Sequence, residues 1–133
     1  MREILSILKK YLFGICCVVI LIIFQANCDL ALPEFVLYAV VKNLLENALL
    51  HANADVIEVS MQENTFCIQD NGTHLNAEDI LYLGQRFWRK SAQQKGHGLG
   101  LSLVKMMLQQ YAYAVQFEPN LPTGLKITVL SRR

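Results

Sequence analysis

The sequence predicts an α+β domain in which one mixed sheet carries helices on one of its faces. Two stretches, 55–70 and 113–130, each contain two runs of alternating apolar and polar residues separated by turn residues, which is typical of β-hairpins. The helical segments that precede and separate these hairpins do not follow the regular strand–helix–strand order of a parallel sheet. The two hairpins therefore predict a largely antiparallel framework with helices packed against it.

Composition limits the classes of protein to which the chain can belong. With 133 residues, of which 53% are apolar and 17% charged, it can bury one core and is too apolar to remain disordered. Twelve basic and 11 acidic residues give a net charge of +1, so the electrostatic footprint of a nucleic-acid-binding protein is missing. The four cysteines form no C-x-x-C pair and no regular Cys/His spacing. This pattern gives no indication of a zinc site, and it favours a reducing compartment.

The N-terminal segment has two interpretations. Apolar residues at a helical period over 2–12, followed by a β-branched run over 18–24, predict a helix and then a buried strand. Alternatively, the uncharged run 11–24, which follows two lysines, is similar to a signal peptide or a membrane segment. That run is shorter than the roughly 18–20 residues of a spanning helix, so we favour the helix and strand.

A buried helix and the first hairpin follow. Pro33 suits the first turn of a helix, and the residues from Glu34 to His51 are apolar on almost every side, which is typical of a buried helix. The segment 55–61 alternates apolar and polar residues, and 66–70 follows after a turn, so the two predict a hairpin. The tripeptide Asp70-Asn71-Gly72 breaks the second strand.

The second half of the chain combines a short helix, a basic loop, a longer helix and the second hairpin. Asn76 is the expected N-cap of a helix over 77–83, whose first turn contains two acidic residues. The stretch 86–95 is a basic loop that contains two aromatic residues. A glycine-rich segment then leads into a helix that ends near Tyr111, after which the second hairpin closes the chain.

The buried helix carries a polar stripe. Asn43, Asn47 and His51 are spaced four residues apart and therefore share one face, with Glu46 beside them. A buried amide without a partner costs roughly 1–3 kcal/mol, so a polar group must face this stripe. That group is either neighbouring backbone or a ligand whose oxygens accompany a magnesium ion, which prefers amide and water oxygens.

Asp70 is the second candidate site residue. It shares strand parity with Phe66 and Ile68, so its carboxylate is expected on the core side at the end of a strand. A buried acceptor in that position can receive a hydrogen bond from an exocyclic amine such as N6 of adenine. The same Asp-Asn-Gly sequence also fits a simple turn.

A glycine-rich segment and the basic loop are candidates for phosphate binding. Gly96-His97-Gly98-Leu99-Gly100 allows backbone N–H groups to approach phosphates ahead of a helix N-terminus, although a flexible loop fits it equally. A Walker loop is excluded because the required Lys-Ser/Thr pair is absent. The basic loop could supply positive charge to a transferring phosphate, or it could be a solvated loop with an aromatic anchor.

The order of these motifs resembles the catalytic and ATP-binding domain of sensor histidine kinases, in the superfamily shared by gyrase, Hsp90, these kinases and MutL. The resemblance covers about Leu30 to Leu130, and 2–24 fits the helix and edge strand that precede it in the family. The family's asparagine, first glycine, phenylalanine, second glycine and closing glycine motifs correspond to Asn43–Ala48, Asp70–Gly72, Arg86–Arg89, Gly96–Leu101 and Thr123–Ile127. The resemblance implies a two-layer α/β sandwich of Bergerat type over 1–133, with an ATP lid at 73–95.

The resemblance also implies roles for individual residues. Asn47 would ligate Mg²⁺, Asn43 would support the phosphates, and Asp70 would accept the adenine amine beside Gly72. The catalytic residues that the resemblance implies are the two asparagines and Arg89. The remaining residues expected to contact ATP are His51, Arg86, Phe87, Lys90, Lys95, Gly96, Gly98, Leu99, Gly100 and Leu101. Gyrase-like relatives carry a water-activating glutamate where this chain has Asn43, and an amide cannot act as that base, so the resemblance implies phosphate transfer rather than hydrolysis.

Two positions depart from the family pattern. His74 replaces a glycine of the first glycine motif, and Leu50 replaces a lysine or arginine that contacts phosphate. His51, His74 and His97 all fall within nucleotide-binding motifs, so we expect the phosphoacceptor histidine on a separate dimerisation domain and a response regulator downstream. The chain is then expected to be a monomeric domain, with no nucleic-acid partner, on the cytoplasmic side of a longer inner-membrane sensor.

These observations favour an ATP-dependent protein-histidine kinase domain. The nearest alternative is a nucleotide-binding module that signals through ligand-dependent ordering of its lid, without catalysis. A third interpretation, from another class, is a small membrane-tethered interaction protein.

Overall fold

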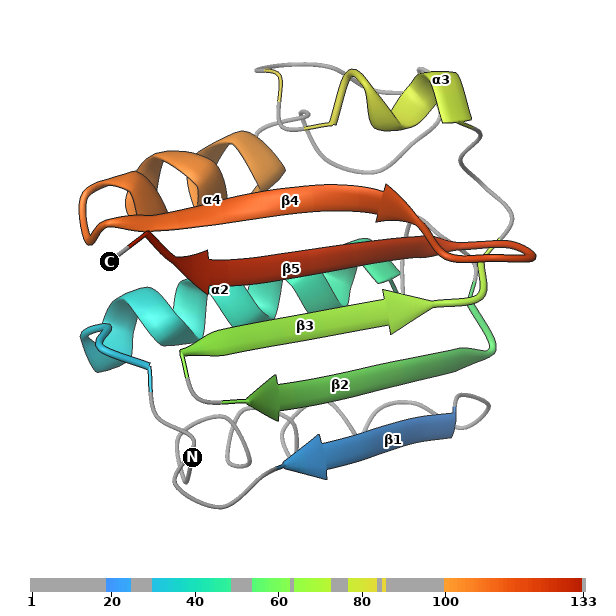
Figure 1. Ribbon diagram of the computed structural model, residues 1–133, viewed down its shortest axis with the longest axis horizontal. Coiled ribbons are helices and arrows are strands. Elements are labelled where there is room, and N and C mark those ends of the chain that lie inside the picture. The colour runs from blue at the N-terminus through green and yellow to red at the C-terminus, as the bar shows by residue number, and fades with distance from the viewer. Residues whose placement is uncertain are drawn as a thin grey trace.

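The computed structural model describes residues 19–24 (backbone only), 30–48, 54–62, 64–72, 77–83, 85 and 100–132. The helix expected over 2–12 lies outside these residues. The elements are, in chain order (Figure 1), β1 (Val19–Phe24), α2 (Glu34–Glu46), β2 (Val56–Gln62), β3 (Thr65–Asp70), α3 (Ala77–Ile80), α4 (Gly100–Gln109), β4 (Tyr113–Pro119) and β5 (Leu125–Ser131). Both predicted hairpins and the strand expected near 18–24 are therefore confirmed.

The strands form one five-stranded sheet in the order β1-β2-β3-β5-β4. β1 pairs with β2 in parallel, whereas the three other pairings are antiparallel. The sheet is thus mixed, as the sequence predicts, with its single parallel pairing at one edge. Among the described residues, no helix is both long enough and apolar enough to cross a membrane.

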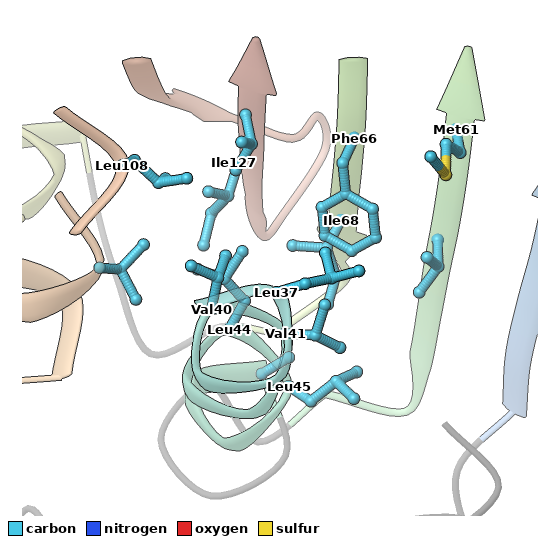
Figure 2. Packing of buried hydrophobic residues seen from close by; sticks show 14 of the residues in the cluster. Leu37, Val40, Val41, Leu44, Leu45, Met61, Phe66, Ile68, Leu108 and Ile127 are labelled. Carbon is cyan, nitrogen blue, oxygen red and sulfur yellow. The ribbon is translucent and has the colours of Figure 1, made fainter. Parts of the chain in front are cut away.

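Two helices cover one face of this sheet and share one core with it. Leu37, Val40, Val41, Leu44 and Leu45 of α2 point toward the sheet in Figure 2, where they meet Phe66, Ile68 and Ile127. Leu108 of α4 joins the same cluster. The strands supply alternate residues, since β2 buries every second residue from Ile57 to Met61. This arrangement confirms the predicted α+β class with helices on one face.

Several element ends differ from the prediction. Pro33 is the N-cap of α2, with φ −58° and ψ 149°, and so precedes the first helical turn instead of lying in it. The short helix α3 ends at Ile80 rather than near Leu83, and i→i+3 hydrogen bonds continue it as turns. α4 ends at Gln109, and Ala112, with a φ of 60°, turns the chain into β4. These ends are set by local hydrogen bonds, which periodicity does not encode.

Candidate functional site

Four of the predicted site residues that the structure describes lie on element ends that face the same side of the molecule. Figure 1 shows that α2 and β3 both run toward this side, so their C-terminal ends lie there together, and that α4 begins toward it. Asn43 and Asn47 are at the end of α2, Asp70 is the last residue of β3, and Gly100 is the first of α4. The fold thus brings together three of the motifs on which the resemblance is based.

Asp70 is a buried polar residue at the end of β3, with 4% of its surface exposed. Its Oδ1 accepts hydrogen bonds from the backbone N–H of Gly72 at 2.9 Å and of Leu125 at 3.3 Å. Among the described residues, both hydrogen bonds to this carboxylate use Oδ1. None of the described residues donates a hydrogen bond to Oδ2 in these two contacts.

The surroundings of Asp70 make its charge costly. Burial raises the pKa of its carboxyl above the ordinary value, and the two backbone hydrogen bonds lower the pKa by less than burial raises it. A carboxylate held in such a position accepts hydrogen bonds strongly, because little water competes for it. The bond from the Gly72 N–H to Oδ1 also fits the turn interpretation, so the role of Asp70 in binding a ligand stays a prediction.

Asn71 and Gly72 fix the chain immediately after Asp70. The Asn71 Oδ1 accepts from the N–H of Asp55 at 2.9 Å and of Val56 at 3.0 Å, where β2 begins. The Asn71 N–H returns a bond to the Val56 carbonyl at 3.3 Å. Gly72 is buried and donates to Asp70. The tripeptide is therefore a corner of the chain that hydrogen bonds fix in place, and it holds one buried acceptor. The sequence analysis did not predict that Asn71 fixes this corner.

The loop between β4 and β5 packs on the same corner. Asn120 donates from Nδ2 to the Asp70 carbonyl at 2.7 Å, and Thr123 donates from Oγ1 to the Asn71 carbonyl at 3.1 Å. Gly124 has a φ of +119°, and a Cβ placed on it would lie 1.8 Å from the Asp70 carbonyl oxygen. The sequence analysis assigned no role to Asn120. An asparagine in a loop favours hydrogen bonds to backbone, but nothing in the sequence specifies which backbone.

The polar stripe of α2 touches the start of α4. Asn43 is half-buried, and its Nδ2 donates to the Ala39 carbonyl at 2.7 Å. Its Oδ1 lies 3.1 Å from the position that a Cβ on Gly100 would take. The asparagine and second glycine motifs are therefore in contact. Backbone thus satisfies one amide N–H of Asn43, as one interpretation of the stripe expects, and the ligand interpretation stays a prediction.

Asn47 lies where α2 ends. Its backbone N–H donates to the carbonyls of both Asn43 and Leu44, and its φ and ψ remain helical. The side chain is half-buried and, in the part of the chain that the structure describes, makes no hydrogen bond. None of the described residues therefore occupies its amide oxygen.

The other expected site residues divide into two groups. Leu101, in the first turn of α4, is half-buried and packs against the core cluster. The rest lie outside the described residues, together with most of the expected lid 73–95; they are His51, Arg86, Phe87, Arg89, Lys90, Lys95, Gly96, Gly98 and Leu99. The geometry of the site therefore comes from its asparagine motif, its aspartate corner and the start of α4.

Comparison with known proteins gives the class to which this fold and site belong. Residues 34–132 match the family model for histidine kinase-, DNA gyrase B- and HSP90-like ATPases. This match spans most of the chain, so the chain belongs to that family. Within the family, its relatives and structural neighbours are sensor kinases, which identifies it as a sensor histidine kinase catalytic and ATP-binding domain.

Three individual proteins illustrate this relationship. The sensor protein QseC of Salmonella typhi is 33% identical over 118 residues, which cover 79% of this chain and 26% of QseC. The mycobacterial sensor histidine kinase MprB has a TM-score of 0.81 at 18% identity, covering 98% of this chain and 91% of that one. The ATP-binding domain of PrrB from Mycobacterium tuberculosis has a TM-score of 0.77 at 19% identity, covering 98% and 90%. The chain thus spans about a quarter of the length of QseC.

Proposed function

We propose that this domain binds ATP with Mg²⁺ and transfers the γ-phosphate to a histidine on a partner dimerisation domain. A response regulator would then receive the phosphate. Relatives that are described as sensor proteins support this assignment. A place for the domain on the cytoplasmic side of an inner-membrane sensor belongs to the same proposal.

The observation that carries the proposal is the buried Asp70 carboxylate. Its Oδ1 is occupied by two backbone N–H groups, which restrain the carboxylate, so Oδ2 is the atom that would accept from a ligand donor. The exocyclic amine of adenine is such a donor. Gly72 follows within hydrogen-bonding reach of Asp70 and leaves room beside the base.

Asn43 favours transfer to an acceptor over hydrolysis. An amide cannot remove a proton from water, and the Asn43 N–H is already committed to the Ala39 carbonyl. In the transfer, the acceptor nitrogen forms a bond to the γ-phosphorus while the bond to the β–γ bridging oxygen breaks, and ADP leaves with that electron pair. The basic loop, Arg89 included, would stabilise the negative charge on the transferring group.

The available donor atoms fit a magnesium site. The Asn47 amide oxygen has no partner among the described residues, and a neutral amide oxygen suits Mg²⁺, which keeps several waters beside its few protein ligands. Bound Mg²⁺ would neutralise charge on the triphosphate. The start of α4, beside Asn43, adds the partial positive charge of a helix N-terminus near the phosphates.

Calorimetry with ADP and with a non-hydrolysable ATP analogue tests nucleotide binding. We expect Asp70→Asn to weaken ADP binding by roughly 1–3 kcal/mol, the scale of a lost charged hydrogen bond at a buried site. Equal affinity of variant and wild type would remove Asp70 from the site.

Labelled ATP, mixed with a supplied dimerisation domain, tests phosphate transfer. We expect label on that domain, and none on a version whose phosphoacceptor histidine is replaced by alanine. Nucleotide binding without transfer to any supplied domain would instead support the nucleotide-binding module without catalysis. Two departures from the family pattern favour that alternative. Leu50 replaces a lysine or arginine that contacts phosphate in the family, and His74 replaces a glycine of the first glycine motif.

A further inference from the structure

We propose that Asn120, in the β4–β5 loop, is a positioning residue for adenine recognition, because it holds the backbone of Asp70 where the carboxylate meets the base. The inference rests on the proposed nucleotide binding and adds a residue from outside the motifs of the resemblance. Asn120 itself need not touch the nucleotide.

Asp70 lies at the point where the regular pairing of β3 with β5 ends. The ladder between β3 and β5 ends with Gln69 opposite Lys126, so Asp70 lies just beyond the last pair. On its other side, the Asn71 N–H bonds to the Val56 carbonyl of β2. The Asp70 carbonyl therefore needs a partner that the regular ladder with β5 does not supply.

Asn120 supplies that partner. Its Nδ2 donates to the Asp70 carbonyl at 2.7 Å, while its backbone N–H bonds to the Gly124 carbonyl at 3.0 Å and closes the loop. The Leu125 N–H, which directly follows this loop, donates to the Asp70 Oδ1 instead of to its carbonyl. One short loop thus holds both the main chain and the side chain of Asp70.

The position of the carboxylate depends on the contacts that the β4–β5 loop and Leu125 make with Asp70. Oδ1 is held by two N–H groups, one of which, at 3.3 Å, comes from Leu125, the residue that directly follows the loop. Gly124 has no Cβ and packs directly on the Asp70 carbonyl, so the two segments are in contact without intervening side chains. When the Asn120 bond is lost, the Asp70 peptide can rotate, and the direction of Oδ2 changes with it. Small displacements of this kind weaken a directional hydrogen bond strongly.

The inference predicts a loss of base discrimination, which a general loss of stability would not produce. ADP has an amine at position 6, whereas IDP has an oxygen there and offers Asp70 no donor from that position. A residue that positions Asp70 should therefore affect ADP and not IDP. A residue that only supports the fold should affect both nucleotides equally.

The experiment measures the affinity of the full chain for ADP and IDP by calorimetry. In the wild type we expect tighter binding of ADP. In Asn120→Ala we expect ADP affinity to fall about 3- to 10-fold and IDP affinity to change less than twofold. Asn64→Ala, an exposed asparagine in the turn at the other end of β3, is the matched control and should leave both affinities unchanged.

Two further variants complete the test. The isosteric Asn120→Asp removes the donor without changing size, and it replaces the alanine variant if that variant does not fold. In an Asp70→Asn background, Asn120→Ala should have no further effect on the ADP/IDP ratio. An unchanged ratio in the single Asn120 variants, or an equal loss of both affinities, would overturn the inference while leaving nucleotide binding intact. A wild type that binds neither nucleotide would overturn the proposed function itself, and equal wild-type affinity for both would overturn adenine recognition by Asp70.

Discussion

Asp70 combines burial with charge, and the two oppose each other in the folded state. Because burial raises its pKa, the folded chain binds a proton at this carboxyl more tightly than the unfolded chain does. Stability therefore falls as pH rises from the ordinary aspartate range through the raised folded pKa, and it remains at the lower level above that pKa. A ligand amine would recover part of this cost when it bonds to Oδ2.

This opposition predicts that Asp70→Asn stabilises the domain at pH 7. An asparagine keeps an oxygen for the N–H groups of Gly72 and Leu125 but carries no charge to bury. The gain in free energy of unfolding should shrink as pH falls into the ordinary aspartate range. Urea unfolding of both proteins between pH 4 and 8 measures it, with Asp55→Asn, at an exposed position, as control. A variant less stable than wild type at neutral pH would contradict this account.

Asn47 gives a second prediction, which concerns magnesium. We expect Asn47→Ala to abolish the Mg²⁺-dependent gain in affinity for an ATP analogue while leaving the fold intact, because the lost amide oxygen is the proposed ligand. Calorimetry with and without Mg²⁺ measures this gain, and thermal unfolding monitors the fold. If the variant keeps the full gain, the side chain at the end of α2 has only a structural role.

At the residue scale, the sequence predicts the site only where a side chain follows the parity of its element. The burial of Asp70 follows from its alternation with Phe66 and Ile68 along β3. The contact of Asn43 with Gly100 was not predicted, because it joins two helices that are distant in the sequence. The bond from Asn120 to the Asp70 carbonyl spans 50 residues and depends on how the loop turns, which no local pattern encodes.

The elements themselves are largely predictable, because each has a clear period. α2 and α4 bury the residues that recur at helical spacing, and β2 buries every second residue. The order of the strands could not be predicted in the same way. β3 pairs with β5, and β1 pairs in parallel with β2. Each of these two pairings joins strands that are distant in the sequence, so no local period encodes it.

The β4–β5 loop provides a prediction at this scale. Gly124→Ala should reduce the free energy of unfolding by at least about 2 kcal/mol, since φ is +119° and a Cβ would overlap the Asp70 carbonyl oxygen. Gly100→Ala is a matched control, because among the described residues its Cβ would meet only the flexible Asn43 side chain, at 3.1 Å. We expect the control to cost less than about 1 kcal/mol. Urea unfolding compares the two, and similar losses would contradict the assigned close approach.

At the scale of the whole molecule, the described part of the chain has one hydrophobic core between the sheet and the helices. Phe66 is 1% exposed and lies on the inner face of β3 toward α2 (Figure 2). We expect Phe66→Ala to lower the free energy of unfolding by about 3–5 kcal/mol, the usual cost of removing a buried aromatic ring. Phe35→Ala, where the ring is 68% exposed, should change it by no more than about 0.5 kcal/mol. Chemical denaturation of both variants measures the two changes, and equal losses would contradict the assigned burial of Phe66.

The hydrogen bond from Leu125 to Asp70 has a consequence for how the domain folds. It joins residues 55 positions apart that belong to different hairpins. Hairpins form within about 1–10 μs from local contacts, whereas the pairing of β3 with β5 must close a long loop and is therefore slower. The proposed adenine acceptor exists only after the two hairpins have docked. A nucleotide that binds only the completed domain stabilises it by about 2.7 kcal/mol when its concentration is 100 times Kd. Cellular ATP would thus favour newly made chains that have finished folding over those that have formed only their separate hairpins.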